Sequence, residues 1–421
     1  MDKPMKSILK PILIQGIVQH YDWGGREFIP GLIGRTELSA RPCAELWLGS
    51  HTKAPSIARV GGAEIPLTEL LFHSGREILG TAAARRFDGQ LPYLLKVLDA
   101  KKMLSIQAHP NLQQAAEGYA RENKAGIDPS APTRVYKDRN HKPEVHVALT
   151  EFWMLHGFRP LQEIADILDN VPELRPLMPG FRDQLALMGG DRAKRAALLR
   201  SLYERAMTLP QSQVDELLGP MLARLEKQGS LDKDLPDFWA LRAGREFPLP
   251  QNHRDRGILS IYLLNLVHLR PGEATYQPAG TLHAYLEGTN VELMANSDNV
   301  LRGGLTPKHV DVPELMRIAN FDSGKPAVIR GNPVSDAEVV YPTAAEEFQL
   351  SRITLGGSTP TCKVGGSGPQ IILIIEGGAG VLSDRGSCSL KRGEAALIPH
   401  NCLCQLQLEG AGAVIFRAAL P

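Results

Sequence analysis

The chain has 421 residues, more than one ordinary hydrophobic core accommodates, so two or three domains are expected. Its 47 basic and 46 acidic residues leave a net charge of +1. This balance argues against a nucleic-acid or anionic-membrane partner, so any bound anion must be held by a local cluster of charges. No apolar run is long enough to span a bilayer, and we expect no signal peptide at the N-terminus.

The five cysteines form no C-x2-C pair, and their odd number favours reduced thiols in a cytoplasmic protein over a disulfide framework. Cys402 and Cys404 alternate along an expected strand. We interpret them as packed thiols and not as metal ligands.

Residues 1–158 contain short strand-like runs separated by glycine and proline turns, for example Leu94 to Leu98 and Val145 to Leu149. One amphipathic stretch, Leu112 to Lys124, predicts a helix after Pro110.

Residues 159–255 differ in pattern, with apolar residues at helical spacing and charged residues on a solvated face. Asp191 is expected to cap one helix and Gly229 to stop another, while Pro220 is expected to interrupt the helix in which it lies. We predict a helical insertion that carries no chemistry.

From residue 256 the pattern returns to strands, beginning with 258–269, which we predict as a strand or a strand pair. Residues 323–421 are almost wholly β, with short strands between glycine-rich turns. The expected fold is mainly β with a helical insertion: two related jelly-roll domains plus an α-helical domain. The first jelly roll comprises residues 1–158 and 256–322, the insertion 159–255, and the second jelly roll 323–421.

Four side chains from separate segments have the chemistry of metal ligands. Gln107 and His109 share one face if their segment is a strand, because side chains alternate with a period of two. Glu144 lies at the start of an apolar strand and supplies a carboxylate, and His283 follows a glycine turn. Two histidines, one carboxylate and one amide suit a borderline divalent ion, with zinc favoured.

Each of these signals has a simpler alternative. Gln107-x-His109 alone is more often a polar strand end packed at a turn, and Glu144 beside Lys142 can be an ordinary surface ion pair. His146 shares a face with Glu144, so it is either a competing ligand or, as we favour, a core histidine.

Residues 297–308 form the densest block of polar residues beside glycines in the chain. Arg302 can bind a phosphate through its guanidinium and Lys308 can add a second positive charge. Gly303 and Gly304 would let the backbone approach a ligand closely. The alternative is a loop with a charged surface.

In order along the chain, six blocks resemble the type I mannose-6-phosphate isomerases, zinc enzymes of the cupin superfamily. The blocks are YDWG (21–24), AELWLG (44–49), LLKVLDAKKMLSIQAHPN (94–111), YKDRNHKPEVHVAL (136–149), AGTLHAYLEG (279–288) and MANSDNVLRGGLTPKHVDVPEL (294–315). The resemblance implies two cupin-type domains, one zinc ion held by Gln107, His109, Glu144 and His283, and a small sugar phosphate as the partner. It also implies a substrate pocket that includes Ser105, Lys142, Tyr285, Arg302 and Lys308. His400 of the second β domain has no partner ligands, so no second metal is expected, and no obligatory protein partner is inferred.

Exchange of mannose 6-phosphate and fructose 6-phosphate normally passes through a cis-enediol, which needs a base, an electrophile and a grip on the phosphate. We expect zinc to polarise the substrate oxygens or to order the water that does. Ser105 and Lys308 are expected to bind the phosphate, and Arg302 either binds it or stabilises the negative charge that develops.

The base is left open by the sequence. Lys142 is the first candidate and His141 the second, although His141 can instead help to open the sugar ring because imidazoles exchange protons near neutral pH. Asp298 and Glu292 are the remaining alternatives, and Glu292 is also expected to line the substrate pocket.

Two other functions fit a jelly-roll protein. An iron dioxygenase would show a tighter His-x-His and glutamate set, which is absent here, and would consume oxygen. A non-catalytic sugar-binding protein would need no intact ligand set, and it would bind mannose 6-phosphate without turnover.

Overall fold

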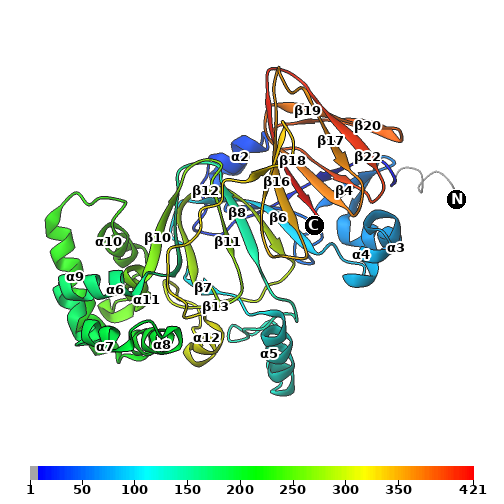
Figure 1. Cartoon of the computed structure of the whole chain (residues 1–421). Coiled ribbons are helices and arrows are strands. Elements are labelled where there is room, and N and C mark those ends of the chain that lie inside the picture. Colours follow the sequence, from blue (N-terminus) through cyan, green and yellow to red (C-terminus); the bar gives the residue numbers. More distant parts are fainter. Residues whose placement is uncertain (1–7) are drawn as a thin grey trace.

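The computed structural model describes residues 8–421. Strands form the middle and one end of the molecule, and the helices from α6 to α11 gather at the other end (Figure 1). The expected mainly β fold is confirmed, and in the sequence a helical block stands between strand-rich segments.

A ten-stranded antiparallel sheet carries most of the predicted site. Its centre is β12 (His283–Ala295), which pairs with β6, β7, β8 and β9. Segments far apart in the sequence therefore meet along this one strand. The other members are β2 (Ile17–Gln19), β3 (Glu45–Leu48), β6 (Tyr93–Ala100), β7 (Gln107–Ala108), β8 (Glu144–Ala148), β9 (Phe152–Phe158), β10 (Leu264–Leu269), β11 (Ala274–Gln277) and β13 (Leu301–Arg302).

The second sheet has nine strands and unites both ends of the chain. Strand β1 pairs with β21, with Ile12 opposite Leu397, so N-terminal strands extend a sheet made mainly of C-terminal ones. The order is β14 (Asn332–Pro333), β15 (Glu338–Tyr341), β16 (Gln349–Leu355), β23 (Ala413–Ala419), β18 (Gln370–Glu376), β21 (Ala395–Ile398), β1 (Ile12–Gln15), β4 (Ile57–Val60) and β5 (Ala63–Pro66).

A third sheet of four strands completes the C-terminal part, with the order β17 (Thr361–Gly365), β22 (Leu403–Leu408), β19 (Gly378–Ser383) and β20 (Gly386–Lys391). Cys402 directly precedes β22 and Cys404 lies within it; both are buried, and their Sγ atoms are 3.7 Å apart. Both cysteines are therefore packed thiols, as expected from the sequence.

Within the helical block, local signals set the start of one helix and the end of another. The Asp191 carboxylate accepts a hydrogen bond from the Lys194 N–H at 3.1 Å and caps α8, and Gly229 ends α9 with a φ of +79°. Both expectations are confirmed. The block comprises α6 (Leu161–Asn170), η2 (Pro172–Leu177), α7 (Phe181–Met188), α8 (Arg192–Thr208), α9 (Gln211–Gln228), α10 (Pro236–Glu246), η3 (Pro250–Asn252) and α11 (Gly257–Leu263).

Two predictions for this region are wrong. Pro220 does not interrupt its helix, because α9 continues through it with buried leucines and methionine on both sides holding the two halves in one core. Residues 258–263 form helix α11 and not a strand. Every residue of α11 is buried, so its sequence lacks the polar spacing that separates a helix from a strand.

The remaining helices flank the sheets: α2 (Phe28–Leu32), η1 (Thr36–Ala40), α3 (Leu67–Leu79), α4 (Thr81–Arg86), α5 (Leu112–Lys124) and α12 (Val312–Ile318). Helix α5 has the predicted bounds, because Asn111 and Gln114 form a reciprocal capping box at its start.

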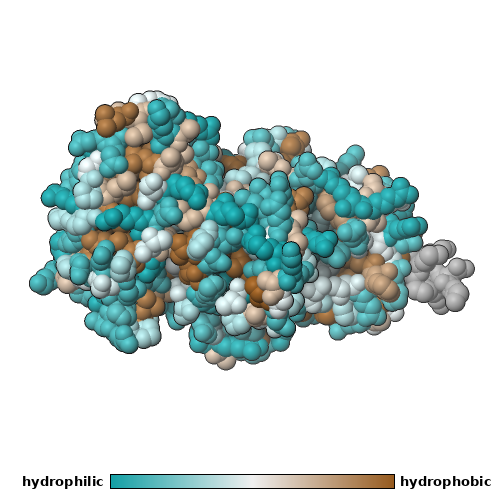
Figure 2. Space-filling model, turned by 90° about the horizontal axis from the view of Figure 1, so that it is seen from below, coloured by the Kyte–Doolittle hydropathy of each residue, from teal (hydrophilic) through white to brown (hydrophobic). Residues whose placement is uncertain are grey.

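Within residues 8–421, no helix combines the length and the apolar character that crossing a bilayer requires. The face drawn in Figure 2 is largely hydrophilic, with apolar residues in small groups between polar ones.

Gly304 is required for close packing inside the protein. Its φ is +118°, and a Cβ atom there would lie 2.5 Å from the Cα atom of Gly257 in α11. The backbone that follows Arg302 is thereby held close against helix α11.

We therefore expect Gly304→Ala to lower the free energy of unfolding by about 1–3 kcal/mol, through backbone strain and overpacking. Thermal unfolding measures this effect. Gly219→Ala is the matched control, because a Cβ atom at that helical position meets nothing within 4 Å. Equal melting temperatures for the two variants would contradict the packing role.

Candidate metal centre and substrate pocket

Three of the four predicted metal ligands meet in the ten-stranded sheet. His109 follows β7, Glu144 begins β8 and His283 begins β12. His109 Nε2 lies 3.4 Å from one Glu144 oxygen and His283 Nε2 lies 3.3 Å from the other. All three residues are buried, and their ligand atoms lie within 4.8 Å of one another.

Hydrogen bonds orient both imidazoles toward this point. The Nδ1–H of His109 donates to the Asn299 carbonyl at 2.7 Å, and that of His283 donates to the Thr281 carbonyl at 2.9 Å. Each Nε2 therefore presents its lone pair to Glu144. Nε2 of His109 is buried without a hydrogen-bond partner in the described chain, and an unpaired buried acceptor of this kind fits a bound cation.

Gln107, the fourth predicted ligand, lies beside the triad. In the strand register it stands opposite His283 on one side and Arg302 on the other. Its Nε2 donates to Ser105 Oγ at 3.3 Å, which leaves its carbonyl oxygen free to ligate. Two imidazole nitrogens, one carboxylate and one amide oxygen form a donor set that fits zinc.

Electrostatics set the charge of the triad at neutral pH. Burial alone would raise the pKa of Glu144, but the Lys142 ammonium, 3.0 Å away, and His109 hold it well below its usual value. Burial, with a smaller contribution from Lys142, lowers the pKa of His109 to about 4. The carboxylate is therefore ionised and the imidazole neutral, which are the forms that bind metals.

Buried histidines make stability depend on pH. Burial lowers the pKa of His109 and His156 to about 4 and that of His146 to about 3, against about 6.5 in an unfolded chain. Between these values the unfolded chain binds more protons, so the free energy of unfolding should fall as pH drops from 6.5 to 4.

The expected slope is up to about 1.4 kcal/mol per pH unit for each histidine. Urea unfolding of the metal-free protein across this range measures it. His156→Gln should reduce the slope, and an unchanged slope would contradict the assignment.

His146 is a core residue and not a ligand of the triad, as we favoured from the sequence. It is fully buried, and its ring contacts Thr275 at 3.0 Å and Gln277 at 3.0 Å.

Tyr285 and Glu292, both expected to line the substrate pocket, belong to a buried chain of polar groups. The Tyr285 hydroxyl donates to Glu292 at 2.6 Å, and Lys96 Nζ lies 3.2 Å from Glu292 and 3.5 Å from Glu45. Burial raises the pKa of Glu292, and Lys96 opposes this rise. A buried carboxyl group with a raised pKa is suited to proton transfer.

Sequence reasoning missed Lys96 and Glu45. A signal was present for each, because Lys96 is the one charge within the apolar run Leu94 to Leu98 and Glu45 opens the equally apolar strand β3. A charge that interrupts a buried strand needs a partner or a function.

Arg302 and Lys308 lie close enough for Arg302 to help lower the pKa of Lys308, after the larger effect of burial. Burial lowers the pKa of Arg302 itself. Neither side chain has a carboxylate partner within the salt-bridge distance among residues 8–421. Two neighbouring cations without a counter-ion favour an anion between them.

Asp298 and His141 contact other partners. The Asp298 carboxylate lies 2.8 Å from Lys53 and 3.4 Å from His51, which hold its pKa low against the effect of burial. His141 Nε2 lies 2.8 Å from Glu347 of the C-terminal part. The structure does not bring either residue into direct contact with the triad.

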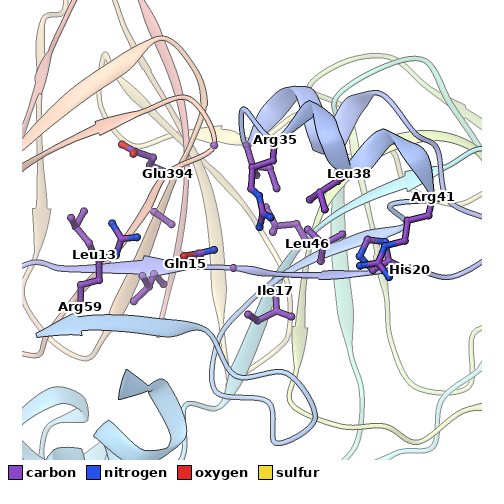
Figure 3. A pocket seen from close by; sticks show the side chains of 16 residues that line it. Leu13, Gln15, Ile17, His20, Arg35, Leu38, Arg41, Leu46, Arg59 and Glu394 are labelled. Atoms are coloured by element: carbon purple, nitrogen blue, oxygen red, sulfur yellow. The ribbon is translucent and has the colours of Figure 1, made fainter. Parts of the chain in front are cut away.

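A separate cavity of about 530 Å³ lies where the chain passes from β1 in the nine-stranded sheet to β2 in the ten-stranded sheet (Figure 3). Gln15, Ile17, Arg35, Arg59 and Glu394 are among its lining residues. None of the predicted site residues lines it, so this cavity is not the metal centre.

Comparisons with known proteins agree with one another. Residues 12–161 match the family model described as phosphomannose isomerase type I, catalytic domain. Mannose-6-phosphate isomerases from Shigella flexneri and Escherichia coli K12 are each 36% identical over 387 residues, covering 91% of this chain and 93% of theirs. A crystal structure of mannose 6-phosphate isomerase from Salmonella typhimurium, bound to substrate (fructose 6-phosphate) and zinc, aligns with a TM-score of 0.82. It is 33% identical and covers 98% of this chain and 99% of its own.

Proposed function

The chain belongs to the type I phosphomannose isomerase family, and from that membership we propose that it interconverts mannose 6-phosphate and fructose 6-phosphate. The observation that carries this proposal is the buried triad of His109, Glu144 and His283, with both Nε2 atoms turned toward one carboxylate. The relatives to which the chain aligns over nearly their whole length are named for this activity.

We propose that Gln107, His109, Glu144 and His283 hold one zinc ion. The unpaired Nε2 of His109 and the carbonyl partners of both Nδ1 atoms support this assignment. When bound, the ion supplies a Lewis acid for the substrate oxygens.

The reaction moves a proton between C1 and C2 of the sugar, through a cis-enediol. We assign the proton transfer to Lys142, whose Nζ is buried and lies 3.0 Å from Glu144, and which takes the proton as the neutral amine. Glu292 is the alternative base, because it is buried and its carboxylate accepts a hydrogen bond from the Tyr285 hydroxyl. Ring opening by His141, and Asp298 as a further alternative base, stay proposals.

We assign phosphate binding to Lys308 and Ser105, with Arg302 acting on the phosphate or on the enediolate. The two neighbouring cations without counter-ions support an anion at this place. Binding the distant phosphate holds the reacting end of the substrate in position.

Lys308→Ala should raise KM for mannose 6-phosphate by about 10- to 100-fold, because a charge-assisted hydrogen bond contributes about 1.5–3 kcal/mol. We expect kcat to change little, since the bond is present before and during the reaction. Steady-state kinetics measure both constants, with Lys325→Ala as the exposed control. A fall in kcat at constant KM would place Lys308 at the reacting atoms instead.

The experiment that tests the function is a coupled assay of mannose 6-phosphate conversion before chelation, after chelation and with zinc restored. Activity lost with the metal and recovered with zinc is the expected result. No activity in fully zinc-loaded protein would overturn the proposal.

We also propose that the chain comprises two cupin-type jelly rolls and a helical insertion. The sheet orders support this, with the qualification that β1, β4 and β5 of the first 158 residues lie in the sheet of the C-terminal jelly roll. Five free cysteines, four of them buried, support a reducing compartment such as the cytoplasm.

A further inference from the structure

We propose that Asn299 is a positioning residue that couples the metal ligand His109 to the loop carrying Lys142. This inference rests on the proposed zinc site. It concerns residues 296–300, between β12 and β13, which contact the loop 137–142 that precedes β8.

Asn299 is fully buried and uses both ends of its side-chain amide on one loop. Its Oδ1 accepts hydrogen bonds from the backbone N–H groups of Lys137 at 2.7 Å and Asp138 at 3.2 Å. Its Nδ2 donates to the carbonyls of Asp138 at 3.0 Å and Asn140 at 2.8 Å. One side chain therefore replaces the backbone pairing that this irregular loop lacks.

The same residue holds His109 through its main chain. The carbonyl of Asn299 accepts the Nδ1–H of His109 at 2.7 Å, and this bond directs Nε2 toward Glu144. The position of that carbonyl depends on the side-chain anchor of its own residue. Metal ligand and loop are thus connected through one amino acid.

Neighbouring contacts make the connection rigid. Ser297 Oγ accepts from the Asn299 N–H at 3.2 Å and donates to the Asp138 carboxylate at 2.9 Å. The Asp298 N–H donates to the other Asp138 oxygen at 2.8 Å. The two segments are interlocked by buried or half-buried hydrogen bonds, which strengthen one another in a low-dielectric environment.

Coupling of this kind works in both directions. A metal that fixes His109 also fixes the Asn299 carbonyl, and hence the loop that ends at Lys142. Zinc should therefore reduce local opening of the loop, even though loop residues 137–140 supply no predicted ligand.

Hydrogen exchange in the unmodified protein tests this first. The amides of Lys137 and Asp138, which donate to Asn299, should exchange about 10-fold or more slowly with zinc than after chelation. Zinc-independent exchange of both amides, in protein shown to bind zinc, would overturn the proposal.

The second test is Asn299→Ala, with zinc affinity measured by competition with a chromophoric chelator. Outer partners of metal ligands typically contribute about 10- to 100-fold in affinity, and a loss of that size is expected. The zinc effect on the exchange of Lys137 and Asp138 should also disappear in this variant.

Asn265→Ala is the matched control. Asn265 is also buried, and the two N–H groups of its Nδ2 lie within hydrogen-bond distance of four backbone carbonyls, those of His156 (3.1 Å), Gly157 (3.2 Å), Phe158 (3.0 Å) and Gly324 (2.8 Å). This variant should lose stability while keeping its zinc affinity. Equal zinc affinities for the two variants would overturn the proposal, and the exchange measurement on unmodified protein decides the question if Asn299→Ala does not fold. Amide exchange and zinc affinity are both measured without turnover. A failure of the proposed isomerase activity can therefore be distinguished from a failure of this proposal.

Discussion

Glu144→Gln is expected to abolish zinc binding and turnover together. Glu144 is the one anionic ligand of the candidate centre, and each of its oxygens faces one histidine Nε2. The neutral amide lacks the charge that attracts the ion. Loss of a residue that only hydrogen-bonds a metal ligand typically lowers affinity by about 10- to 100-fold, and loss of a ligand should lower zinc affinity by more than that. Metal analysis and the coupled assay measure the two effects on the same samples.

The same change leaves the buried Lys142 ammonium without its carboxylate, so stability should fall as well. Breaking a buried pair by removing one partner costs about 3–5 kcal/mol. Glu338→Gln provides a matched control, because Glu338 is buried and lies 2.6 Å from Arg417 in the nine-stranded sheet. It should be destabilised while keeping zinc and activity. Full zinc content in Glu144→Gln would remove Glu144 from the ligand set.

Lys142→Ala is expected to separate catalysis from metal binding. Loss of a general base lowers turnover by about 10²–10⁴-fold. Zinc content should stay intact, because removing a cation 3.0 Å from Glu144 does not weaken the attraction of that carboxylate for a metal. Metal analysis and kcat measure the two quantities.

The remote Lys325→Ala variant, at an exposed ion pair with Glu163, should keep both. Full activity of Lys142→Ala would exclude Lys142 as the base and direct attention to Glu292. In that case Glu292→Gln should show the loss of turnover instead, since Glu292 is the other buried group placed for proton transfer.

Much of the local structure was predictable because short-range interactions determine it. Helix α5 has the predicted bounds because Asn111 and Gln114 form a capping box within four residues of each other. Strand β8 was predictable as a run of apolar and β-branched residues that follows Pro143. Such signals depend on neighbours in the chain.

Partners across the fold were not predictable from one sequence. Nothing near Lys96 identifies Glu292 as its neighbour, and nothing near His141 identifies Glu347, since these pairs are separated by 196 and 206 residues. The fully buried run Gly257–Leu263 became a helix, although its composition is equally compatible with a strand.

The sequence by itself therefore determined the family of the chain and a set of candidate side chains for its site, because ordered motif blocks and residue types are local properties. The tertiary structure alone decided that β1 extends a C-terminal sheet, that Gly304 packs on α11, and that Asn299 joins His109 to the loop before β8. The physical reason is that strand register, close packing and buried hydrogen bonds are selected by the free energy of the whole fold, in which distant segments compete for the same partners.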